Sequence, residues 1–138
     1  MKKLLMIPVL LLLLACEEKG ELTKDGFNVA TINQDAVLKY HGTFVPTSGI
    51  SATGDVEIYL ENNQYKVKLN NFVVTDGPDL KIYLSKAATP NDFVSLGNLT
   101  SATVYNVPQG VDVTGYSHIL IHCQQYNHLF AIAQLIQN

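Results

Sequence analysis

The stretch DVEIYLENNQYKVKL, residues 55–69, decides the fold class. Polar and apolar side chains alternate on both sides of Asn62-Asn63, and a period of two predicts half-buried β-strands. Paired asparagines between such strands predict a tight turn, because asparagine tolerates the left-handed backbone that hairpin turns require. The stretch therefore predicts a β-hairpin, and its core face consists of Val56, Ile58, Leu60, Tyr65, Val67 and Leu69.

The opposite face of this hairpin is charged. Asp55 and Glu57 on one strand should share a face with Lys66 and Lys68 on the other. Opposite charges across a β-ladder stabilise a hairpin by about 0.2–1 kcal/mol for each pair. We interpret these residues as sheet stabilisers rather than as a binding site.

Further short strands flank the hairpin. Alternation or short apolar runs predict strands at 36–45, 80–85, 93–96, 103–107, 116–123 and 129–136, with glycine-containing turns between them. No helical period is found after residue 36. About eight short strands without helices predict an all-β fold, either an antiparallel β-sandwich or a barrel-like sheet.

The N-terminus has the pattern of a lipoprotein signal peptide. A basic start, Met1-Lys2-Lys3, precedes the apolar run Leu4–Leu14, and Ala15-Cys16 closes it. The run has about 11 residues, whereas a membrane-spanning helix needs roughly 20. In such peptides the cysteine, here Cys16, takes a lipid and becomes the new N-terminus. A plain secretory signal is the alternative.

These features divide the chain into three parts. We predict a signal peptide at 1–15, the lipidated Cys16 with a flexible tether at 16–35, and a β domain at 36–138. The charged start of the tether, 17–26, is typical of a solvated linker. The predicted location is extracytoplasmic, with a lipid anchor in the bacterial cell envelope. We expect the outer membrane, and the periplasmic and surface faces both stay open.

Charge argues against nucleic acid as a partner. Removing the leader takes away Lys2 and Lys3, two of nine basic residues, and none of the twelve acidic ones, so the formal charge goes from −3 to −5. The chain has no arginine and no basic stripe that would displace counterions from phosphate. The lipid at Cys16 is therefore the expected membrane contact.

Recognisable catalytic motifs are absent from the sequence. It contains no phosphate-binding loop, HExxH or GxSxG. Acidic residues fall mostly in predicted turns or on outer faces, so no catalytic residue is nominated. We do not expect a stand-alone enzyme.

Cys123 stands out, because lipidation of Cys16 leaves it as the single thiol. Strand parity places it on one face with Ile119 and Ile121, opposite to His118, Leu120 and His122. Free cysteines are usually small buried core residues. An unpaired thiol in an oxidising compartment is nevertheless oxidised unless it is buried or used. Redox or metal-ligand chemistry is therefore the alternative, and a Cys16–Cys123 disulfide is a third.

The histidines are the candidate ligands beside Cys123. His122 is adjacent, His128 follows a loop that can fold back, and His41 from a distant strand would complete a His-Cys-His copper site. However, both methionines lie in the leader, so no axial methionine exists. Covalent haem needs CxxCH, which is absent, whereas non-covalent haem stays open. Cys123, His122 and His128 are therefore the candidate cofactor-binding residues, no metal site is predicted, and the cofactor is left open as none, haem or copper. For each histidine taken singly, a structural role is the alternative.

A series of short motifs resembles the DM13 family. The motifs lie in order at 42–44, 54–58, 69–72, 77–80, 83–85, 96–99 and 105–108. The most specific part comes last: Tyr116, Ile119-Leu120-Ile121-His122-Cys123, Tyr126, Phe130, Ala133 and Leu135. Their order and spacing carry the resemblance, which covers roughly residues 36–137.

The resemblance implies an extracytoplasmic all-β module with a role in electron transfer or redox reactions. The characteristic cysteine of the family, here Cys123, is thought to act as a bare thiol or to hold a group such as haem. Where a tryptophan commonly precedes that cysteine, this chain has His122. The substitution either removes packing for a cofactor or supplies a new ligand or proton donor.

Two hypotheses follow for the function. The first is a lipid-anchored redox protein centred on Cys123, with a redox partner protein. The second is a cell-envelope binding or adhesion module in which Cys123 is a buried core residue. Thiol accessibility separates them, because a redox thiol should react with a labelling reagent in the native state.

Overall fold

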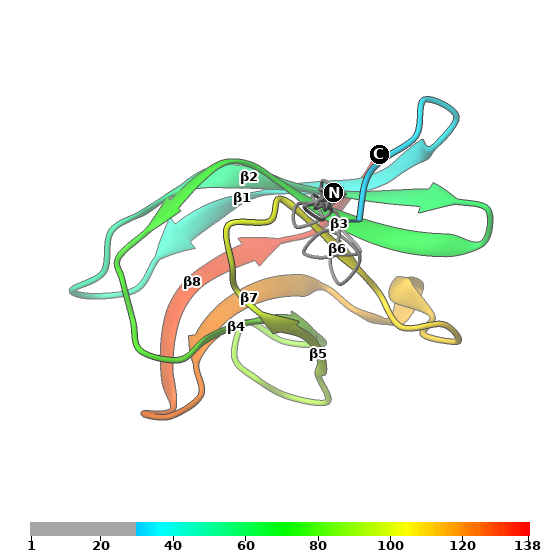
Figure 1. The fold of residues 1–138 in the computed structure, drawn as a ribbon. Coiled ribbons are helices and arrows are strands. Elements are labelled where there is room, and N and C mark those ends of the chain that lie inside the picture. The colour runs from blue at the N-terminus through cyan, green and yellow to red at the C-terminus, as the bar shows by residue number, and fades with distance from the viewer. Residues whose placement is uncertain (1–29) are drawn as a thin grey trace, which may run out of the picture.

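The structure is a computed structural model that describes residues 30–138. The predicted signal peptide, Cys16 and most of the tether lie outside the described residues. Residues 30–138 form nine strands, one short 3-10 helix (Val113–Gly115) and no α-helix, and Figure 1 shows how they are arranged. The strands are β1 (Val37–Pro46), β2 (Ala52–Glu61), β3 (Gln64–Val74), β4 (Leu80–Ser85), β5 (Val94–Asn98), β6 (Val104–Asn106), β7 (His118–Cys123), β8 (His128–Gln134) and β9 (Ile136–Gln137). The all-β prediction is therefore confirmed.

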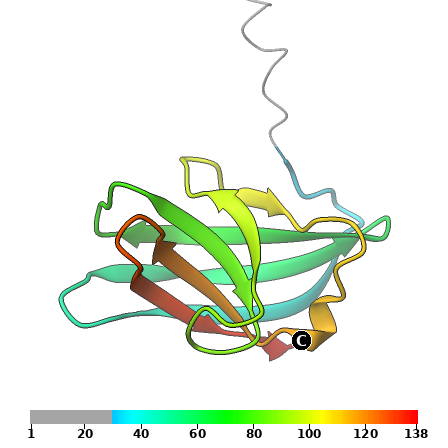
Figure 2. The same cartoon turned by 90° about the horizontal axis from the view of Figure 1, so that it is seen from below.

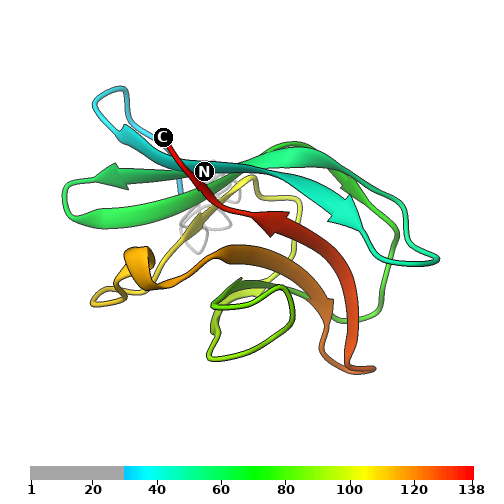
Figure 3. The same cartoon turned by 180° about the vertical axis from the view of Figure 1, so that it is seen from behind.

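The strands form one antiparallel, nearly closed, barrel-like sheet. Its order is β5-β4-β7-β8-β1-β2-β3-β6, and β9 pairs with β1. The sheet curls into two layers, with β1, β2, β3 and β6 in one and β4, β5, β7 and β8 in the other (Figures 1 and 2). Viewed from behind, β8 runs from the second layer up to β1 (Figure 3). Phe44, Val45 and Pro46 of β1 pair in that order with Ala133, Ile132 and Ala131 of β8, and this ladder joins the layers. Among the described strands no ladder closes the other side, between β6 and β5, and this side is called the seam below.

The β2–β3 hairpin has the predicted register. Val56 pairs with Leu69 and Ile58 with Val67, and all four side chains are buried. Asn62 and Asn63 both have positive φ, at 51° and 64°, as a tight hairpin turn requires.

The expected ion pairs of this hairpin do not form as predicted. The side chain of Lys66 pairs with Glu61, at 3.0 Å. Glu57 instead accepts hydrogen bonds from Asn70, at 2.6 Å, and from Tyr59, at 3.2 Å. The prediction was wrong because the next outward residue, Asn70, reaches Glu57, and the end of β2 offers Lys66 a buried carboxylate that also binds Asn33.

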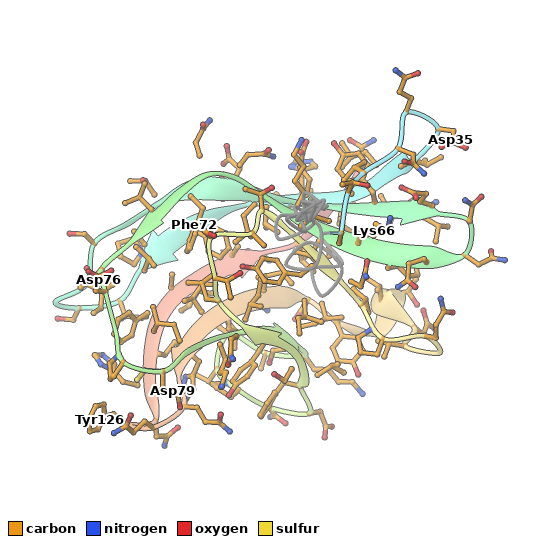
Figure 4. All side chains as sticks on the ribbon, viewed as in Figure 1. Asp35, Lys66, Phe72, Asp76, Asp79 and Tyr126 are labelled. Atoms are coloured by element: carbon orange, nitrogen blue, oxygen red, sulfur yellow. The ribbon has the colours of Figure 1, made fainter. Side chains whose placement is uncertain are left out.

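A bulge near the far end of the hairpin redirects β3. Asp55 pairs with Asn70 but Thr53 pairs with Val73, so β3 has one extra residue there. Gly54 and Asn71 adopt positive φ, at 117° and 49°. The shift turns Phe72 inward, where its ring lies 4.7 Å from that of Phe44. Figure 4 shows Phe72 on the inner side of β3.

The last predicted strand, 129–136, is interrupted. β8 ends at Gln134, and the Leu135 amide donates to Ser117, at 2.8 Å, before β9 begins at Ile136. Leu135 thereby packs against the core.

Within residues 30–138 no helix is long and apolar enough to span a membrane.

Candidate functional site at the end of β7

Cys123 is the last residue of β7 and the free cysteine of the described residues. It is 1% exposed and belongs to the main core cluster, together with Ile119 and Ile121. Its ladder partners are Leu80 on β4 and His128 on β8. The next residue, Gln124, begins the exposed hairpin turn. The thiol is therefore shielded from solvent although it lies at the margin of the sheet.

The β3–β4 connection, residues 75–79, lies against this end of β7. A Cβ placed on Gly77 would come within 2.9 Å of Leu80 and 3.1 Å of the Phe130 ring. The Gln124 amide donates to Asp79, at 3.0 Å. Figure 4 shows Asp79 and Tyr126 at the same end of the molecule. The apolar surroundings of Cys123 are closely packed as a result.

His128 lies directly opposite Cys123 across the β7–β8 ladder. Directly opposed residues place their Cβ atoms about 4.5–5.5 Å apart on one face. The His128 ring is exposed and packs edge-on against Phe130, with 4.9 Å between centroids. The fold-back of residues 124–127 that the sequence allowed therefore does bring His128 to Cys123.

His122 lies on the outer face of β7, away from the thiol. It is 5% exposed, and its ring centroid lies 5.5 Å from that of Tyr83. Its Nε2 lies 3.0 Å from Asn127 Oδ1, whereas Nδ1 is buried without a hydrogen-bond partner. The tautomer that fits donates from Nε2–H to Asn127 and leaves Nδ1 as an unprotonated acceptor. His122 therefore does not share a ligand set with Cys123.

Tyr83 is a part of this site that the sequence did not predict. Its ring stacks on Phe93, with 4.2 Å between centroids, and lies 5.5 Å from the His122 ring. Burial, and then the nearby Asp79 carboxylate, raise the pKa of the Tyr83 phenol. The register of β4 against β7 is a contact distant in sequence, so only the family motif at 83–85 pointed to this tyrosine.

The remaining histidines lie elsewhere. His41 is exposed on β1, where it pairs with Glu57 and Ile136. His118 begins β7, and its Nδ1 lies 2.7 Å from Ser117 Oγ. Burial lowers the pKa of the His118 imidazole. Within residues 30–138 no three side chains of histidine, cysteine, aspartate or glutamate are grouped as a metal site, so the His41-Cys123-His128 copper arrangement does not form.

The β7 end lies inside a stretch that matches a known family. Residues 43–135 match the family described as Electron transfer DM13. The chain belongs to the DM13 family. No curated protein and no solved structure gave a match. The resemblance read from the sequence is therefore confirmed, with Cys123 and both neighbouring histidines inside the matched residues.

The packing of this DM13 domain does not suit a haem on Cys123. Four surface cavities of the described residues have volumes of about 240 to 580 Å³, and none is lined by Cys123, His122 or His128. Cys123 is 1% exposed within the core cluster, so a haem on the thiol would have to displace neighbouring core side chains. The residues present fit a bare thiol better than a ligand to a large macrocycle.

Proposed function

We propose that this DM13 protein is a lipid-anchored electron-transfer component in which the bare thiol of Cys123 is the redox group. The observation that carries the proposal is the position of the single described thiol, which ends β7 inside the electron-transfer match. A thiol at this position is out of reach of bulky oxidants, yet it lies one residue from the surface. Electrons can cross such a short layer of protein without contact between the reactants.

His128 is the proposed proton partner of Cys123. A neutral thiol that gives one electron to the oxidised centre of a partner protein also loses its proton. The His128 imidazole shares a face with Cys123 across the ladder and is exposed. It can therefore pass that proton between the thiol and solvent, and the reverse transfer restores the thiol.

Voltammetry of the full chain in detergent tests this role. We expect a reversible signal from the wild type that Cys123→Ala abolishes. His122→Phe should retain the signal, because it leaves the thiol in place. A signal that survives in Cys123→Ala would overturn the proposal.

A second candidate function is a cell-envelope binding module, which the 1% exposure of Cys123 favours. It predicts no voltammetric signal in either protein and a thiol that labels only in denaturant. Native labelling, the test that the sequence suggested, does not separate the two functions in this fold, because a thiol that is 1% exposed labels slowly in either case. The voltammetric comparison is therefore the deciding experiment.

The membrane anchor is a separate part of the proposal. We propose that Cys16 carries lipid and holds the domain at the outer membrane, on its periplasmic or surface face. The support is the order of basic, apolar and small residues before Cys16. Feeding the native host a radioactive fatty acid should label the wild type and leave Cys16→Ser unlabelled. Equal labelling of both proteins would refute the anchor.

A further inference from the structure

The seam of the barrel holds a cavity whose lining does not include Cys123, His122 or His128. Residues 99–103, called the seam strap below, cross from β5 to β6 (Figure 2). Leu99 donates its amide to Leu80 on one side, at 2.8 Å, and Leu69 donates to Thr103 on the other, also at 2.8 Å. The strap is thus tied to both layers, and the cavity lies between it and the second half of β3.

The inside of the strap is fixed by Tyr105. Its hydroxyl accepts a hydrogen bond from the Thr100 amide, at 3.1 Å, and donates to the Ala102 carbonyl, at 3.0 Å. Tyr105 is the middle residue of β6 and is buried. The cavity therefore has a formed wall that does not depend on a ligand to order it.

The walls of the cavity are apolar. Its volume is about 460 Å³, within the range of about 300–1,000 Å³ that is usual for small-molecule sites. The apolar lining consists of Leu69, Phe72, Val74, Leu99 and Ala102, together with Val73. The Phe72 ring is braced from behind by Phe44. Such walls favour a ligand with apolar surface.

The polar side chains of the cavity are uncharged and exposed: Asn71, Thr100, Ser101 and Thr103. Thr100 Oγ1 accepts from the Ala102 amide, at 3.1 Å, and within the described residues none of the four side chains donates to a protein acceptor, so their O–H and N–H groups are free to donate to a ligand. None of the lining side chains carries a charge. A charged ligand would lose its hydration without an opposite charge to replace it, so the cavity suits a neutral molecule with acceptor oxygens.

We propose that the seam cavity binds a quinone, a neutral ring with carbonyl acceptors. The choice of a redox-active ring rests on the proposed electron-transfer function, and the apolar walls and uncharged donors stand independently of it. The hydroxyls of Thr100, Ser101 and Thr103 are the donors to the carbonyls, and Phe72 lies against the ring.

Tetramethyl-1,4-benzoquinone is the probe for this site, because its fully methylated ring adds poorly to thiols. The full chain in detergent is titrated with it and followed by methyl NMR. We expect saturable shifts of the Leu69, Val74 and Leu99 methyl groups. Tetramethylbenzene has the same methyl groups but no carbonyls, so it accepts no hydrogen bond. It should bind about tenfold more weakly, because each net hydrogen bond contributes about 1 kcal/mol. Shifts that never saturate, or that arise elsewhere, would overturn the proposal, as would equal binding of both probes.

A filled cavity supplies the second arm of the test. Ala102→Phe should lower quinone affinity at least tenfold, whereas Ala88→Phe, on an exposed loop outside the cavity, should not change it. Ala102→Leu serves in the same way if the larger side chain prevents folding. Unchanged affinity in a folded Ala102 variant would refute the site. Cys123→Ala should bind the quinone normally, so a failure of the thiol role and a failure of the quinone site give different results.

Discussion

The β2–β3 and β7–β8 hairpins are both antiparallel, but β7 is buried on both of its faces whereas β2 is buried on one. In β2, Val56 and Ile58 are fully buried, while the intervening Glu57 is only part-buried and binds polar neighbours. In β7, Ile119, Leu120 and Ile121 are all fully buried, so both faces of the strand are covered. Tyr83, the ladder partner of Leu120, is buried on the outer side of the sheet beside β7, and Phe93 stacks on it.

This difference teaches what a polar residue must do in each setting. On β2–β3 the outer side chains can exchange partners with one another and with water. On β7 a polar side chain has to find its partners inside the protein, and His122 finds one of two. Substitutions at outward positions of the two hairpins should therefore change the free energy of unfolding by different amounts.

The largest effect is expected at the bulge of the β2–β3 hairpin. A Cβ on Gly54 would lie 2.7 Å from the Phe72 Cα and 2.8 Å from the Asn70 carbonyl oxygen, at a φ of 117°. Gly54→Ala should destabilise the protein by about 4 kcal/mol, because backbone strain and overpacking add. Urea unfolding measures the loss.

Gly97→Ala is the matched control for this bulge. Gly97 has a similar φ of 106°, but a Cβ there would meet nothing within 4 Å. Its cost should be about 1–2 kcal/mol, from backbone strain alone. Equal costs at the two glycines would show that crowding at the bulge contributes nothing.

The second effect tests the double coverage of β7. Leu120 lies on the outer face of the strand yet is 0% exposed. Leu120→Ala should cost about 3 kcal/mol, within the usual range for a buried leucine. Tyr59→Ala, at an outward position of β2, should cost about 1 kcal/mol. Similar values for both would contradict the contrast between the two hairpins.

The contrast also explains how far the sequence could be read. Alternation along 55–69 predicted the register and core face of β2–β3, because water on one side keeps polar residues at every second position. The same reasoning placed Ile119, Ile121 and Cys123 together in the core, but it gave no sign that Leu120 and His122 are buried as well. On that second face the neighbour of Leu120 and His122 is Tyr83, which comes from a distant part of the chain.

The candidate site divides in the same way. Cys123 and the fold-back of His128 follow from local sequence, since a four-residue loop joins β7 to β8. The break at Leu135 and the seam cavity could not be predicted, because each depends on pairing between segments far apart. Glu61 was missed as the partner of Lys66 because the predicted alternation ended at Leu60, whereas β2 runs on to Glu61, the next outward position.

A smaller effect is expected at Glu61, the carboxylate at the end of β2. The Asn33 amide, and then Lys66, lower the pKa of Glu61 below its ordinary value. A lowered pKa contributes stability that is present above the ordinary carboxyl range and is lost as pH falls through the folded-state pKa. Glu61→Gln should therefore lose less stability than the wild type between about pH 6 and about pH 3.

Urea midpoints at several pH values measure this acid dependence. Lys66→Met should keep a part of it, because the hydrogen bond from the Asn33 amide, the largest single cause of the shift, remains. An acid dependence that disappears in Lys66→Met would show that the ion pair dominates.

The smallest effect is expected at His122, although its side chain is 5% exposed. His122→Phe removes a buried Nδ1 acceptor that has no partner, and the released Asn127 is exposed and can bind water. Replacing an unpaired buried polar group by an apolar one of similar shape is close to neutral, so the change should stay within about 1 kcal/mol.

Ser85→Ala is the matched contrast: Ser85 is 0% exposed, but its hydroxyl donates to Thr89, at 3.0 Å, and accepts from Asn91, at 3.3 Å. Its loss should cost about 1–2 kcal/mol, because the Thr89 carbonyl and the Asn91 amide lose their partner. A loss above about 2 kcal/mol in His122→Phe would mean instead that Nδ1 holds a partner such as an ordered water molecule, and that β7 satisfies its buried polar groups as completely as β4 does.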